Sequence, residues 1–62
     1  LPQQLTTDEI SELVNQVVQE VGAAGPGDMK SVMPKLMPLV RGKADGQEVS
    51  KMVMEVLRGL SG

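Results

Sequence analysis

The positive charge of this 62-residue chain is concentrated in residues 29–44, which carry four cations and no carboxylate. Within this segment, the loop 41–46 (RGKADG) places Arg41 and Lys43 before Asp45, where a helix is expected to begin. Lysine and arginine pair with phosphate, and the free backbone N–H groups of a helix start attract the same anion. The segment therefore predicts a contact with a phosphate backbone. In the alternative interpretation, Arg41 caps its own helix and the charges form an ordinary solvated face.

The residue types that are missing narrow the chemistry. Without Cys and His, thiol and imidazole catalysis, disulfides and the usual zinc ligands are excluded. The carboxylates fall mostly at helix starts or on exposed faces, and no nucleophile has a base partner. We therefore expect no catalysis within this chain, no metal and no cofactor. Because aromatic residues are also missing, a contact with RNA would depend on shape and phosphate instead of base stacking.

The hydropathy and charge pattern favour partners in solution. No apolar run approaches the roughly 18 residues that a membrane span needs. Residues 1–28 carry five acids and no base, which disfavours binding to a lipid surface. We expect a soluble protein of the cytoplasm, or of an organelle matrix in a eukaryote, that binds neither membrane nor DNA. Because the chain opens on LPQQL without an initiator Met, we also expect it to be part of a longer protein.

Three segments repeat the apolar spacing i, i+3, i+4, i+7, i+8, i+11, which places each set of side chains on one helical face. They predict helices near 7–21, 26–41 and 46–58. Connections of about four residues make neighbouring helices antiparallel, so the expected fold is all-α, a small up-down-up three-helix bundle. The three apolar stripes are Ile10, Leu13, Val14, Val17, Val18 and Val21, then Met29, Val32, Met33, Leu36, Met37 and Val40, then Val49, Met52, Val53, Val56, Leu57 and Leu60.

Capping residues delimit these helices. Thr6 with Glu9, and Asp45 with Glu48, have the spacing of a capping box, in which two side chains satisfy free backbone N–H groups. The middle helix begins less regularly, with glycine at the cap, proline at the first helical position and an acid at the third, residues 25–28. A glycine near the end of each stripe predicts the end of its helix. These glycines are Gly22, Gly42 and Gly59.

Pro34 and Pro38 lie inside the apolar pattern of the middle helix. At about 100° per residue, both fall opposite the apolar stripe, so they should face water together with the carbonyls that they deprive of a donor, those of Lys30 and Pro34. A helix weakened on its outer side bends around the core. We expect a middle helix that is either kinked or broken into 26–33 and 34–41. The prolines either stiffen a short helix or present a polar, irregular surface to a partner.

Three stretches together resemble the C-terminal helical domain of the YqeY family: LPQQLTTDEI, GAAGPGDMKSVMPKLMP and VRGKADGQEVSKMVMEVL. The resemblance covers essentially all of residues 1–62, as one domain. That domain is similar to the tail domain of GatB, a subunit of a tRNA-dependent amidotransferase, through the GKAD turn and Val49. The resemblance implies a C-terminal, non-catalytic accessory module that helps to hold the outer corner of tRNA. Catalysis, of the glutamine-dependent carbon–nitrogen ligase class, would belong to another domain.

The candidate RNA-contacting residues come from two sources. The resemblance implies the four residues of the GKAD turn, and electrostatics adds three cations outside it. The full set is Lys30, Lys35, Arg41, Gly42, Lys43, Ala44 and Asp45.

A different function remains open on the sequence alone. Leu39 and Met54 lie off the apolar stripes of their helices, and methionine is common on adaptable binding surfaces. They predict a protein-interaction or scaffolding module that packs on its own N-terminal domain or on another subunit.

Overall fold

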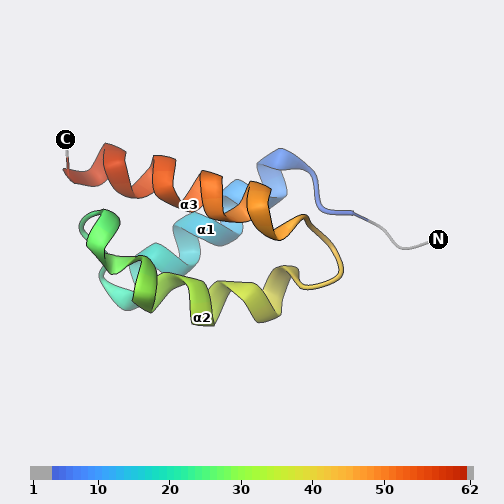
Figure 1. The fold of residues 1–62 in the computed structure, drawn as a ribbon, viewed down its shortest axis with the longest axis horizontal. Helices are drawn as coiled ribbons and strands as arrows, with labels where there is room; N and C mark the ends of the chain where they lie inside the picture. Colours follow the sequence, from blue (N-terminus) through green and yellow to red (C-terminus); the bar gives the residue numbers. More distant parts are fainter. Residues whose placement is uncertain (1–3, 62) are drawn as a thin grey trace.

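The computed structural model describes residues 4–61. This part of the chain forms helix α1 (Thr7–Val21), the 3₁₀ turn η1 (Pro26–Asp28), helix α2 (Met29–Val40) and helix α3 (Gly46–Ser61), and contains no strand. Each α helix contacts the other two. In Figure 1, α3 and α2 lie at the top and bottom of the view, α1 lies between and behind them, and the chain direction alternates. The predicted all-α, antiparallel three-helix bundle is confirmed.

The core of the bundle is built from the predicted apolar stripes. Half-buried methionines, among them Met33 and Met37, pack against its edge. Leu60 is the exception, because it lies in the last turn of α3, beyond the core, and is 52% exposed. Burying one Val or Leu side chain stabilises the fold by about 1.5–3 kcal/mol, so these side chains dominate the folding free energy. The buried residues are Ile10, Val14, Val17 and Val18 of α1, Val32, Leu36 and Val40 of α2, and Val49, Val53 and Leu57 of α3.

Helix α1 begins with the predicted capping box. The backbone N–H of Thr6 donates to the Glu9 carboxylate at 2.8 Å, and the N–H of Glu9 donates to the Thr6 hydroxyl at 3.1 Å. At the start of α3 Asp45 caps the helix without forming the predicted box, because its Oδ1 accepts the N–H of Gln47, at 3.0 Å, and not that of Glu48. Within residues 4–61, the return bond from Asp45 N–H to the carboxylate of Glu48 is not formed.

The predicted glycine stops hold for two helices and fail for the third. Gly22 has φ 68° and Gly42 has φ 77°, the left-handed conformation that lets the chain turn away after a helix. The prediction was wrong at Gly59, because α3 continues to Ser61. The Ser61 hydroxyl donates to the carbonyl of Arg58 at 3.2 Å, so this last turn is held by a bond of its own. A glycine inside a helix costs only about 1 kcal/mol, which does not by itself end it.

The middle helix is kinked, as predicted, but it is not split at the prolines. Helix α2 runs through Pro34 and Pro38 as one element, and both prolines are exposed. The change of helix type occurs earlier, between η1 and α2 at Asp28, whose backbone has φ −91° and ψ 6°. The Asp28 carboxylate accepts the N–H groups of Ala24 at 2.8 Å and Gly25 at 3.3 Å. The N–H of Asp28 donates to the carbonyl of Gly25 at 2.9 Å, the i→i+3 bond of a 3₁₀ turn.

Candidate nucleic-acid interface

The cationic segment, residues 29–44, consists of α2 and the first part of the α2–α3 loop, and its four cations are all exposed. Lys30 and Arg41 are separated by about 16 Å along the axis of α2. At about 100° per residue they point to within about 20° of each other around that axis. Pro34 lies between them along the axis and within about 40° of both around it. These two cations therefore stand at the two ends of one solvent-exposed strip.

Lys35 lies apart from this strip, on the side of α2 that faces α1. Its ammonium group is 4.0 Å from the Glu20 carboxylate, and both side chains are more than half exposed. A pair this exposed adds little to stability. It does place a carboxylate beside one of the predicted RNA-contacting cations, so the charge of Lys35 is partly offset where a phosphate would meet it.

The loop between α2 and α3 is held in place by backbone atoms. The N–H of Leu5 donates to the carbonyl of Lys43 at 2.8 Å, which joins the loop to the start of α1. The N–H groups of Lys43 and Ala44 both donate to the carbonyl of Val40, at 2.9 and 3.0 Å. Gly42 supplies the left-handed residue that this turn requires. The exposed Lys43 side chain therefore stands on a fixed backbone.

The remaining two residues of the predicted turn shape it from within. Ala44 is half-buried and packs against the core. The carboxylate of Asp45 accepts the N–H of Gln47, so the anion-attracting start of α3 is already occupied by a negative charge from the chain itself. A phosphate bound at this corner would therefore be held by the cations and not by the helix start.

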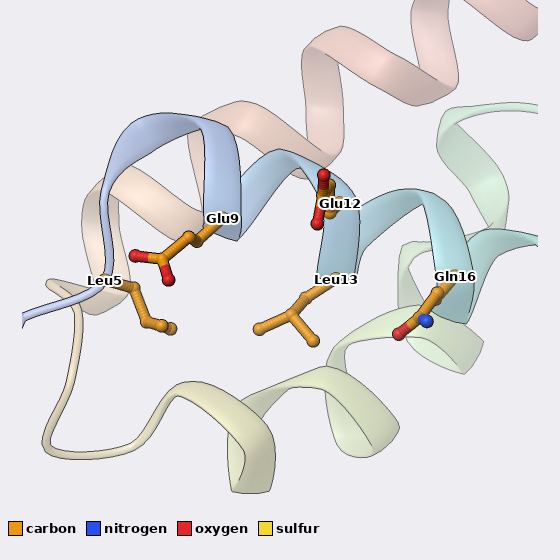
Figure 2. A pocket seen from close by; sticks show the side chains of 5 residues that line it. All are labelled: Leu5, Glu9, Glu12, Leu13 and Gln16. Atoms are coloured by element: carbon orange, nitrogen blue, oxygen red, sulfur yellow. The ribbon is translucent and has the colours of Figure 1, made fainter.

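A shallow hollow on α1, which the sequence reasoning missed, has the opposite charge (Figure 2). It measures about 250 Å³. In Figure 2 the Leu5 and Leu13 side chains extend toward it from α1 and the segment before it. Carboxylates near an apolar floor disfavour phosphate and suit a partner that is apolar or basic. The signal was present in Leu13, an edge residue of its stripe that lies close to two glutamates. The lining residues are Leu5, Glu9, Glu12, Leu13 and Gln16.

The two residues proposed for protein binding differ in exposure. Leu39 on α2 is 47% exposed, whereas Met54 on α3 is half-buried. Neither lines the hollow on α1 or the polar hollow of about 260 Å³ beside it, formed by Glu12, Asn15, Gln16 and Gln19. Leu60, which the sequence placed in the core, is a further exposed apolar side chain.

Metal ligation and membrane crossing find no support in the described part of the chain. Among residues 4–61, no three Asp, Glu, His or Cys side chains gather into a set that could hold a metal ion. The helices within these residues also lack the combination of length and apolar character that crossing a bilayer requires.

Comparison with known proteins identifies the family. The model of the Yqey-like protein family matches residues 1–57, most of the chain. A glutamyl-tRNA(Gln) amidotransferase subunit of Thermococcus gammatolerans is 34% identical to the chain over an aligned length of 61 residues. The alignment covers 92% of this chain and 10% of that protein. The chain thus spans about a tenth of the length of this curated relative. The family match confirms the resemblance drawn from the three sequence stretches, and the chain belongs to the Yqey-like protein family.

Proposed function

We propose that the chain is a non-catalytic accessory module of a tRNA-dependent, amidotransferase-related protein, and that it contacts the tRNA backbone through the cationic segment. The observation that carries this proposal is the exposed strip from Lys30 to Arg41 and the adjoining Lys43 on its fixed loop. The similarity to a protein named for glutamyl-tRNA(Gln) supports the choice of ligand. Catalysis would belong to other parts of such a protein.

The charge distribution supports a single RNA-facing side. The acids Asp8, Glu9 and Glu12 are exposed on α1, and they would repel a phosphate backbone. The cationic segment contains no acid before Asp45. The two charged regions belong to different elements of the bundle, so RNA would approach from α2 and the α2–α3 loop.

The number of phosphates bound sets the expected salt dependence. Lys30, Arg41 and Lys43 are available, whereas Lys35 is partly offset by Glu20. For about three phosphates, log K should fall with log salt with a slope of roughly −2 to −3. Affinity would be modest, because the chain has no aromatic side chain on which bases could stack.

The test is a titration of a fluorophore-labelled tRNA transcript with the protein, followed by fluorescence anisotropy at several salt concentrations. The double variant Lys30→Gln/Lys43→Gln should flatten the slope by about 2 and weaken binding at low salt. Lys51→Gln is the matched control, because Lys51 is an exposed lysine on α3, outside the cationic segment. A second variant, Lys51→Gln/Arg58→Gln, removes the same amount of charge outside the cationic segment. If it changes RNA affinity and the salt slope as much as the Lys30→Gln/Lys43→Gln variant does, only net charge matters and the proposal is overturned.

Amide NMR shifts locate the contact independently of affinity. On addition of tRNA at low salt, the amide signals of residues 41–46 should move together with that of Lys30. Unchanged signals in the loop, with RNA bound, would refute the assignment of this site.

A second candidate function is docking onto protein, on the sequence-proposed residues Leu39 and Met54. The exposure of Leu39 and the apolar floor of the α1 hollow favour it. The test adds the rest of the parent protein and follows the amide shifts. Changes centred on Leu39, Met54 or Leu13 that tRNA does not reverse would support this function. Shift changes confined to the loop 41–46 would argue against it.

A further inference from the structure

The solvent face of α2 carries two backbone carbonyls that lack their helical donor. In an α helix each carbonyl accepts the N–H of the residue four positions on, and proline has no N–H. Pro34 therefore leaves the carbonyl of Lys30 without this donor, and Pro38 does the same for the carbonyl of Pro34. A helical carbonyl points along the axis toward the residue four positions on. Because both prolines are exposed, both oxygens lie on the face that meets solvent.

The surroundings of these carbonyls restrict what could bind them. The two oxygens are about 6 Å apart along the axis. Exposed cations lie at both ends of the same strip, at Lys30 and Arg41, and the proline rings between them offer no donor. A matching ligand therefore combines negative charge with hydroxyl or amine donors. An RNA backbone has this combination, since phosphates alternate with 2′-hydroxyl groups, and DNA lacks the hydroxyl.

We propose, on the basis of the function proposed above, that the carbonyls of Lys30 and Pro34 accept hydrogen bonds from ribose 2′-hydroxyl groups. The α2 face would then select RNA over DNA. The wide, shallow minor groove of A-form RNA displays its 2′-hydroxyls and can meet a convex helix surface. The cations give affinity for either nucleic acid, whereas the proline-freed carbonyls distinguish the sugar.

The expected selectivity is modest. A net hydrogen bond between neutral groups changes an association constant by a factor of about 2 to 12. Both carbonyls face solvent on an exposed helix surface, so we take the lower end of that range for each bond. Two such bonds give a preference for RNA of about fivefold beyond any difference that arises from helix shape.

The variant Pro34→Ala/Pro38→Ala tests the proposal, because the two new N–H groups reclaim both carbonyls for the helix and leave every charge in place. The control is Pro26→Ala, at the first position of η1, where the helix uses no N–H. Each protein is titrated against three hairpins of one sequence: RNA, DNA and 2′-O-methyl RNA. The methylated hairpin keeps the A-form shape but has no 2′-hydroxyl donor.

The wild-type protein and Pro26→Ala should bind the RNA hairpin about fivefold more tightly than the 2′-O-methyl hairpin. The double proline variant should lose this difference and keep the salt slope of the wild type, which reports the phosphate contacts. If the wild type binds RNA and 2′-O-methyl RNA equally, or if the double variant keeps the wild-type difference, the sugar contact is wrong and the RNA-binding function stands. If the wild type binds none of the hairpins and no tRNA, both proposals fall.

Discussion

Asp45 offers a test that separates folding from RNA binding at one residue. Its carboxylate accepts the N–H of Gln47 at the start of α3, at 3.0 Å, so it stabilises the helix. It also follows Lys43 by two residues, within about 7 Å between Cα atoms. The same negative charge therefore opposes a phosphate bound by Lys43. We expect substitutions of Asp45 to change stability and RNA affinity in different ways.

The magnitudes follow from this geometry. Asn is as good a helix cap as Asp and retains an oxygen acceptor, so Asp45→Asn should change the free energy of unfolding by no more than the lost charge–dipole term, about 0.3–1 kcal/mol. Asp45→Ala removes the acceptor as well and should cost about 1–2 kcal/mol. A phosphate placed about 7 Å from the Asp45 carboxylate would be repelled by about 0.6 kcal/mol in water, so with the phosphate at that distance both substitutions should tighten RNA binding two- to threefold at low salt.

Stability is best measured by urea titration followed by circular dichroism, because the chain has no Trp or Tyr for intrinsic fluorescence. RNA affinity is measured by anisotropy of a labelled tRNA transcript. Glu48→Gln is the control, because Glu48 lies on the same helix turn but makes no return bond to Asp45 within the described residues. If Asp45→Ala leaves the free energy of unfolding unchanged, the Asp45 carboxylate does not act as a helix cap. Weaker RNA binding by Asp45→Asn, with the fold intact, would contradict a phosphate near Lys43.

Three further substitutions test the fold. Gly42→Ala should lower the free energy of unfolding by about 1 kcal/mol in urea titrations, because Gly42 has φ 77°; Gly27→Ala, with no positive φ and open space around it, should lose much less. Leu36→Ala empties a fully buried site and should lower the free energy of unfolding by about 2–5 kcal/mol. This loss is enough to populate unfolded protein, which circular dichroism would detect. A well-folded variant would contradict the described core. Pro34→Ala restores a hydrogen bond to the carbonyl of Lys30 and should raise stability by about 1 kcal/mol, with slower amide exchange in α2; faster exchange would contradict the account of the kink.

The sequence predicted the bounds of α1 because two strong local signals mark its ends. The Thr6–Glu9 capping box and the left-handed Gly22 both form as expected. It did not predict the 3₁₀ turn of η1, since over one turn an apolar pattern cannot distinguish i+3 from i+4 bonding. It also stopped α3 too early, because a glycine ends a helix only where the chain must turn away.

For the candidate site, charge and exposure could be predicted and pairing could not. The positions of Lys30 and Arg41 on one face follow from helical periodicity alone. The approach of Lys35 to Glu20 depends on how α1 and α2 slide against each other, which no local pattern specifies. The hollow on α1 depends on the placement of Leu5 beside that helix, which the tertiary bond to Lys43 helps to set.

That bond, from the N–H of Leu5 to the carbonyl of Lys43, has an evolutionary consequence. It is made by main-chain atoms alone, so it does not depend on which side chains the two residues carry. Mutation can therefore add, remove or invert charge at position 43 while the loop keeps its path. Relatives with this fold could diverge in the nucleic acid or protein that they attract without first having to rebuild the scaffold.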